Sequence, residues 1–194
     1  MPKIDIMTDH SSIQVDSPIE TEIECLMRTH YPYIRRLAIS ILDDESEADD
    51  TAQETFIAAC RSLERFRGEA SPRTWLTSIA VNICRGRLRK RKIIQTLQSS
   101  LQSLHLLRPA PISPEENAVQ SESDRRLWQA VDHLDEKHRL VVILRYVHEL
   151  SVPEIATVLD SSQGTVHSRL HYARKKLQAE LGSLITQEET SDED

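Results

Sequence analysis

Three groups of charged side chains stand out in this sequence, and their chemistry is that of binding rather than of catalysis. Residues 85–92, RGRLRKRK, hold six bases, and residues 161–177, SSQGTVHSRLHYARKKL, hold four arginines and lysines and two histidines. Residues 43–54, DDESEADDTAQE, hold seven acids and no base. Because the net charge of the chain is −7, this segregation is more informative than the total. It indicates one polyanionic partner and one partner of another kind.

Each charged group also has an ordinary structural explanation. Bases are favoured at the C-terminal end of a helix, but six in eight positions repel one another, so we favour a polyanion for residues 85–92. Acids in a first helical turn are stabilising, which explains residues 43–54 as well as a binding role does. Residues 161–177 could bind nucleic acid or form the solvated face of a bundle helix, and the pattern alone leaves both open.

No residues have the spacing of a catalytic or metal site. The sequence contains no phosphate-binding glycine loop, no HExxH and no nucleophile elbow. Cys25, Cys60 and Cys84 are far apart, and we expect reduced, partly buried thiols. His167 and His171 are four residues apart, but no third ligand is nearby. We therefore expect no enzyme activity, no cofactor and no metal.

The segments that must position these charges have the pattern of helices. Only 4 glycines occur in 194 residues and aromatic content is 4%, which argues against sheets and predicts an all-α protein. Apolar residues recur with helical spacing from Pro18 to Ile41, with Pro32 as a potential kink. We expect the next helix to begin with Ser46 as N-cap and Asp49 three residues on. Its apolar stripe would be Ala52, Phe56, Ala59, Cys60 and Leu63.

A third helix is expected to begin at Ser71 and Pro72, after Gly68 has ended the preceding one. Its buried face would comprise Trp75, Leu76, Ile79, Ala80 and Ile83. Residues 93–118 contain three closely spaced prolines, so we expect an extended, flexible linker there. The leucine spacing of LQSSLQSLHLL, residues 97–107, is also compatible with a short helix, which leaves the linker boundary open.

The C-terminal part ends in two short amphipathic helices. The first would have Ser151 as N-cap with Pro153 and Glu154 in its first turn. Asp160 then stands where glycine would be the easiest turn residue. In the following basic helix, the apolar stripe is Val166, Leu170, Ala173 and Leu177. This is a helix-turn-helix pattern, whose second helix can enter the DNA major groove.

These observations divide the chain into five segments. We expect a disordered N-terminal extension at residues 1–19, a helical domain at 20–92, the linker at 93–118, a helix-turn-helix domain at 119–184 and an acidic tail at 185–194. The sequence lacks both the apolar core of a signal peptide and the run of about 20 apolar residues that a membrane span needs. We therefore expect a cytoplasmic protein without membrane insertion.

Two long stretches resemble the extracytoplasmic-function (ECF) class of bacterial RNA polymerase sigma factors. Residues 49–92 resemble the second conserved region of these two-domain proteins, and residues 134–177 resemble their fourth region. The specific elements, in the order of the family, are DxxQE-T-F, FRG-x-x-S-x-x-TWL, AVN and GTVHSRL. Similarity extends over about residues 20–92 and 120–181.

The resemblance implies an alternative sigma factor that binds core RNA polymerase, directs it to promoters through −10 and −35 elements, and promotes DNA melting. It implies contacts with the clamp helices of the largest polymerase subunit and with the flap region, an anti-sigma factor as a further partner, and a monomeric free protein. The residues implied in binding core polymerase are Asp49, Asp50, Gln53 and Glu54.

The resemblance also assigns DNA-binding residues. A loop would receive an unstacked base and cations would hold the single strand. For the −10 element these residues are Phe66, Arg67, Gly68, Ser71, Trp75, Asn82, Arg85, Arg87 and Arg89. The first turns of the basic helix would contact bases of the −35 element and later turns its phosphates. These residues are Ser162, Thr165, His167, Ser168, Arg169, His171, Tyr172, Arg174 and Lys175.

The alternative is a helix-turn-helix regulator that acts without polymerase. It would explain residues 161–177 but not the first domain, because an operator-binding protein has no need of an acidic docking helix followed by TWL and a basic segment. Such a regulator would more often need a dimer interface that matches symmetric half-sites. The sequence therefore favours the sigma factor.

Overall fold

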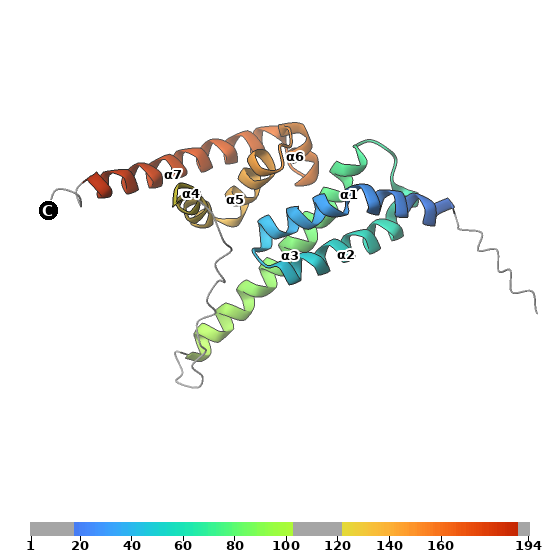
Figure 1. The fold of residues 1–194 in the computed structure, drawn as a ribbon, viewed down its shortest axis with the longest axis horizontal. Helices are drawn as coiled ribbons and strands as arrows, with labels where there is room; N and C mark the ends of the chain where they lie inside the picture. The colour runs from blue at the N-terminus through green and yellow to red at the C-terminus, as the bar shows by residue number, and fades with distance from the viewer. Residues whose placement is uncertain (1–17, 103–121, 190–194) are drawn as a thin grey trace, which may run out of the picture.

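The computed structural model describes residues 18–102 and 122–189, and every regular element in these ranges is helical (Figure 1). This confirms the all-α expectation. The N-terminal extension up to residue 17, the three linker prolines and residues 190–194 lie outside the described residues. The elements are α1 (Pro18–Leu42), α2 (Glu45–Ser62), the short 3₁₀ turn η1 (Leu63–Arg65), α3 (Pro72–Gln102), α4 (Glu122–Asp132), α5 (Glu136–Val142), the π-helical turn η2 (Ile143–Val147), α6 (Val152–Val158) and α7 (Gln163–Glu189).

Helices α1, α2 and α3 pack around a shared apolar core and form the N-terminal unit. Helix α1 continues through Pro32. The sequence-based prediction of Ser46 as the N-cap of α2 is wrong, because the helix begins earlier. Asp44 is the N-cap, with extended backbone and a side chain that accepts a 2.7 Å hydrogen bond from the Glu47 amide. Asp43 makes the preceding turn with a positive φ of 52°.

Helix α3 is longer than expected. Its start is as predicted, because Ser71 Oγ accepts a 3.1 Å hydrogen bond from the Thr74 amide at the first turn. The helix then runs past Lys92 to Gln102, so the expected extended conformation is wrong for residues 93–96, whereas the helix left open for residues 97–107 is present as far as Gln102. No proline follows Pro72 until residue 109. The C-terminal end of α3 projects beyond α1 and α2 in Figure 1, and the side chains of Ile93, Ile94 and Leu97 in this part of the helix are exposed.

Helices α4 to α7 form the C-terminal unit. Ser151 and Glu154 make a complete capping box at the start of α6, as expected. Asp160 has a φ of 46°, the left-handed conformation anticipated for this turn. The predicted stripe of α7 faces inward, with Val166, Leu170 and Ala173 buried and Leu177 packed at its edge. The helix-turn-helix prediction is therefore confirmed.

The two units share one continuous hydrophobic core. Buried side chains form a cluster that runs from α1, α2 and α3 into α5, η2, α6 and α7. A smaller cluster in the C-terminal unit consists of Val131, Leu134, Val142 and Ala173. Between the units, the main packing is that of α3 against α6.

The cysteines differ from expectation in two of three cases. Cys25 and Cys60 are exposed, whereas Cys84 is fully buried. Burial raises the pKa of the Cys84 thiol to about 12. Cys60 was expected on the apolar stripe of α2, but it follows Ala59 by one residue, a step of about 100° that turns it away from the core.

Candidate polymerase- and DNA-binding surfaces

The acidic face of α2 is partly engaged in contacts within the N-terminal unit. Asp49 makes an ion pair with Arg35 of α1, and Glu54 makes one with Arg87 of α3 at 2.7 Å. Asp50 and Gln53 are exposed. No ion pair engages Asp50 within the described ranges. The four residues implied in polymerase binding therefore lie on one helix, but only two of them point outward without a charged partner there.

Ile57 is a candidate that the sequence reasoning missed. Its side chain is 52% exposed, which is unusual for isoleucine within a packed helix. It follows Gln53 by four residues and Glu54 by three, so it lies on the same face of α2. An apolar side chain flanked by acidic and amide groups is typical of the centre of a protein interface. The helical spacing of Ile57 from Gln53 and Glu54 was the signal in the sequence that could have identified it.

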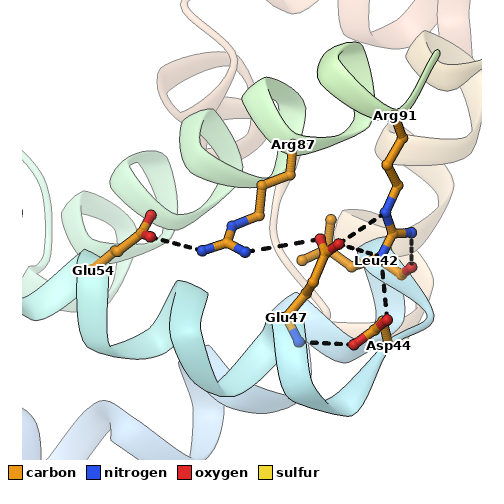
Figure 2. A network of polar contacts seen from close by, with 6 residues as sticks. All are labelled: Leu42, Asp44, Glu47, Glu54, Arg87 and Arg91. Carbon is orange, nitrogen blue, oxygen red and sulfur yellow. Dashed lines mark hydrogen bonds and ion pairs between the residues drawn. The ribbon is translucent and has the colours of Figure 1, made fainter. Parts of the chain in front are cut away.

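The basic segment at the end of α3 is divided between two faces. Figure 2 shows that Arg87 and Arg91 point back toward α2 and the α1–α2 corner. Arg91 donates to the carbonyl oxygen of Leu42 at 2.8 Å and lies 3.1 Å from Glu47 and 3.5 Å from Asp44. These two arginines extend the buried face of α3, which they follow at helical spacing from Cys84.

The outward face of α3 carries the remaining candidates for −10 DNA. Asn82 and Arg89 are exposed, and Arg85 lies between them at helical spacing. Trp75 is seven residues before Asn82 and belongs to the same face. Arg87 falls outside this stripe, in agreement with its contact with Glu54. The predicted role of Arg87 in holding DNA is thus at odds with its position, because its guanidinium is already paired.

The loop before α3 is held by an aromatic pair. The rings of Phe66 and Trp75 stack with centroids 4.6 Å apart and an interplanar angle of 24°. Gly68 has a φ of 72°, a conformation that favours glycine. Arg67 is exposed, and Ser71 caps α3. The structure therefore brings Phe66, Gly68, Ser71 and Trp75 together around one loop.

Helix α7 presents most of the predicted −35 residues on its outer side. His167, Ser168, His171, Arg174 and Lys175 are exposed. Ser162 Oγ accepts a hydrogen bond from the Thr165 amide at 3.1 Å and lies 2.9 Å from Thr165 Oγ1. Both hydroxyls are therefore engaged in hydrogen bonds at the first turn of α7.

Two of the predicted −35 residues have neighbours that the sequence does not reveal. The Tyr172 ring stacks on His138 of α5 with centroids 4.4 Å apart. Arg169 is half-buried and lines a groove toward α3. Tyr172 is nevertheless 54% exposed and stays on the outer side of α7, whereas Arg169 lies toward the groove.

Comparison with known proteins identifies both units. Residues 26–93 match the family model "Sigma-70 region 2", and residues 124–177 match "Sigma-70, region 4". The ECF RNA polymerase sigma factor SigW of Bacillus subtilis is 32% identical over 157 residues, which cover 78% of this chain and 84% of SigW. The chain belongs to the ECF sigma factor family. It is thus an alternative sigma factor, a subunit that directs RNA polymerase to promoters.

One more sigma factor is similar in sequence, and two solved structures are similar in fold. The sigma-H factor of Pseudomonas aeruginosa is 33% identical over 156 residues, covering 77% of this ECF sigma factor and 80% of its own length. Among solved structures, RpoE of Bartonella quintana, in complex with the anti-sigma factor NepR, matches 84% of this chain and 98% of its own with a TM-score of 0.63 and 22% identity. CnrH, in complex with the cytosolic domain of CnrY, matches with a TM-score of 0.58 and 25% identity, covering 84% and 90%.

None of the helices formed by the described residues has the length and hydropathy of a membrane span. Within residues 18–102 and 122–189, no three His, Cys, Asp or Glu side chains are grouped so that they could hold a metal ion.

Proposed function

We propose that this ECF sigma factor binds the clamp helices of core RNA polymerase through the outer face of α2. The exposed Asp50 and Gln53 supply polar groups, and Ile57 supplies an apolar centre. An interface core of this kind, with a polar rim, contributes more to affinity than charge alone. The exposure of Ile57 on the acidic helix is the observation that carries this proposal.

The loop before α3 and the outer stripe of that helix are proposed to engage the −10 element. A flipped base needs a pocket with an aromatic wall, which the stacked Phe66 and Trp75 could supply. Asn82, with donor and acceptor groups, and the cation Arg89 lie farther along the same stripe. Arg87 is not included, since it is paired with Glu54.

Helix α7 is proposed to enter the major groove of the −35 element. Its exposed first turns carry His167, Ser168 and His171, whose side chains can hydrogen-bond to base edges. Arg174 and Lys175 follow one turn later, where they would meet phosphates. The flap region of polymerase remains an expected partner of this unit.

An anti-sigma factor is proposed as a further partner. RpoE of Bartonella quintana, which shares the fold, was solved with the anti-sigma factor NepR. We propose that the present chain acts in the cytoplasm, as a monomer when free, and that a similar inhibitor competes with polymerase for it.

Binding of fluorescently labelled chain to purified core polymerase, followed by run-off transcription, tests these assignments. Asp50→Lys reverses the charge of a polar contact, and Ile57→Asp places an unpaired charge at the apolar centre of the interface, so each should weaken core binding by about tenfold or more. Glu64→Lys makes the same change of charge as Asp50→Lys at an exposed site in η1 and should bind as the wild type does.

Unchanged core binding in both α2 variants would contradict the proposed docking face. Tight binding of the free chain to specific duplex DNA, with no promoter-dependent transcription in the presence of core polymerase, would instead favour a polymerase-independent regulator.

A further inference from the structure

The corner between α4 and α5, residues 133–138, contacts one side of α7. Three side chains of α7 reach this corner, Tyr172, Lys176 and Glu180. They are spaced four residues apart, so they form one stripe along the helix. Helices α4 and α5 both pack against α7 (Figure 1). The corner therefore fixes the position of α7 and its rotation about its own axis.

Two of these contacts are polar and belong to the later part of the stripe. Lys176 donates a 2.6 Å hydrogen bond to the carbonyl oxygen of His133. The His133 ring is hydrogen-bonded through Nδ1 to the Glu180 carboxylate. Although Lys176 belongs to the basic segment of α7, its ammonium group is therefore directed toward the corner.

The third contact, between His138 and Tyr172, joins the corner to the DNA-binding side of α7. His138 is 8% exposed, and its ring stacks on that of Tyr172 with centroids 4.4 Å apart and an interplanar angle of 26°. His138 Nδ1 is hydrogen-bonded to Oδ1 of Asp135, the N-cap of α5. Because an ionised carboxylate can only accept, Nδ1 carries the proton. This bond orients the imidazole, and the stack in turn orients the phenol ring.

Tyr172 lies at the border between the corner and the outer side of α7. It follows Ser168 by four residues and precedes Lys175 by three, so it neighbours two candidates for the −35 element. It remains 54% exposed in spite of the stack. A tyrosine hydroxyl can hydrogen-bond to a DNA phosphate, and phosphate contacts fix the register of a protein on the duplex. A side chain that is ordered before binding loses less conformational entropy when it binds.

We propose that His138 is a positioning residue for promoter recognition, which holds the Tyr172 ring so that its hydroxyl meets a phosphate beside the −35 element. His138 lies beneath the ring and acts on DNA only through it. The stack and the bond to Asp135 exist whatever the function, but their part in promoter binding rests on the proposed function.

A double-mutant cycle tests whether His138 acts through Tyr172. The DNA is a promoter fragment that the wild-type holoenzyme transcribes. His138→Ala should weaken holoenzyme binding about two- to tenfold, the cost of ordering one side chain on binding. In the Tyr172→Ala background the same change should cause no further loss. His138→Phe keeps an aromatic ring beneath Tyr172 and should restore most of the affinity.

The outcomes separate this proposal from the proposed function. Equal losses from His138→Ala in the wild-type and Tyr172→Ala backgrounds would overturn it, because His138 would then stabilise the unit independently of Tyr172. A shorter fragment that ends between the two promoter elements lacks the −35 element, and the wild type and the variants should bind it equally. Equal binding of both fragments by the wild type would instead refute the proposed −35 contact.

The stack itself is measured in the free protein, without polymerase or DNA. NMR of protein labelled on its tyrosine rings gives a Tyr172 signal, which is identified by its loss in Tyr172→Phe. His138→Ala removes the ring current of the imidazole and should shift this signal. The signal of Tyr146, an equally exposed tyrosine of η2 at 55%, should stay in place. An unshifted Tyr172 signal would overturn the positioning role, whatever the holoenzyme binds.

Discussion

The arginines near the end of α3 show that residues of one type in one short segment can take different roles. Arg87 and Arg91 take a structural role. Both belong to the basic run that the sequence associates with a polyanion, yet both turn inward and pair with acids of α2 (Figure 2). Arg91 also donates to the last carbonyl oxygen of α1. It therefore ties together the end of one helix, the start of the next and the third helix, while Arg89 points outward.

Arg91→Ala is expected to lower the free energy of unfolding by about 1–2 kcal/mol. The variant loses a charge-assisted hydrogen bond to the carbonyl oxygen of Leu42 and two ion pairs, partly screened because the arginine side chain is 33% exposed. Urea denaturation measures the change. Arg89→Ala removes an exposed arginine two residues away and should cost less than about 0.5 kcal/mol. Equal losses in both variants would contradict the structural role of Arg91.

His148, whose Nε2 lies 2.9 Å from Ser40 Oγ of α1, gives the packing between the two units a dependence on pH. Its burial, with Arg73 and Arg36 nearby, lowers the pKa of the imidazole to about 4 from its ordinary value of 6.5. The unfolded chain then binds the proton more tightly than the folded chain. The neutral form contributes its full stability above pH 6.5, and this stability is lost as pH falls toward 4. Tyr33 and Ser40 are the other polar groups that face the ring.

Lowering the pH from 7.5 to 5 should therefore destabilise the wild type more than His148→Gln. Glutamine can keep an N–H donor near Ser40 but does not titrate, so the excess loss in the wild type should be about 1–2 kcal/mol. Chemical denaturation at both pH values measures it, and the carboxylates common to both proteins cancel in the difference. The same pH dependence in the two proteins would show that His148 is not the responsible group.

At the scale of elements, α3 and the loop before it depend on two glycines with opposite requirements. Gly68 has a φ of 72°, whereas Gly86 lies within the helix, and neither would bring an added Cβ within 4 Å of another group. Any effect of alanine at these positions therefore comes from the backbone. In the loop, alanine would be strained, and in the helix it would reduce the entropy lost on folding.

Gly68→Ala is expected to destabilise the protein by about 1–2 kcal/mol, and Gly86→Ala to stabilise it by about 0.5–1 kcal/mol. The change of side chain is identical, so the two variants control for each other. Thermal unfolding followed by circular dichroism gives both values. A stabilising effect at Gly68 would mean that the loop does not hold the left-handed conformation.

At the scale of the whole molecule, the net charge of −7 conceals an uneven distribution of acidic and basic side chains over the surface. The exposed acids gather on α2, and exposed cations gather on the outer sides of α3 and α7. An acidic protein can bind DNA in this way because screening limits electrostatic interactions to about 8 Å at physiological ionic strength. The local charge of each face then decides its partner.

Lys175→Ala should weaken promoter binding by the holoenzyme and reduce the slope of log affinity against log salt by about one, if the side chain neutralises one phosphate. Arg28→Ala removes an exposed cation from α1 and should leave the slope unchanged. Filter binding at several salt concentrations measures both. An unchanged slope for Lys175→Ala would place this residue outside the phosphate contacts.

Much of the fold was predictable because its signals are local. Ser151 and Glu154 form their capping box within four residues, and the apolar stripe from Val166 to Leu177 needs only helical spacing. The errors arose where local signals compete. Asp44 and Ser46 are both good N-caps, and the corner that begins at Asp43 decides between them. Residues 93–102 lack strong helix breakers, so the change in composition there did not mark the end of α3.

The sequence by itself determined the helical class, the helix-turn-helix and the family, because periodicity, capping and motif order depend on near neighbours in the chain. Only the tertiary structure decided which basic residues stay available. Arg87 and Arg89 are two residues apart, and their roles differ because α2 packs against one face of α3. The junction of His148 with Ser40 joins residues 108 positions apart, and no local pattern encodes such a contact.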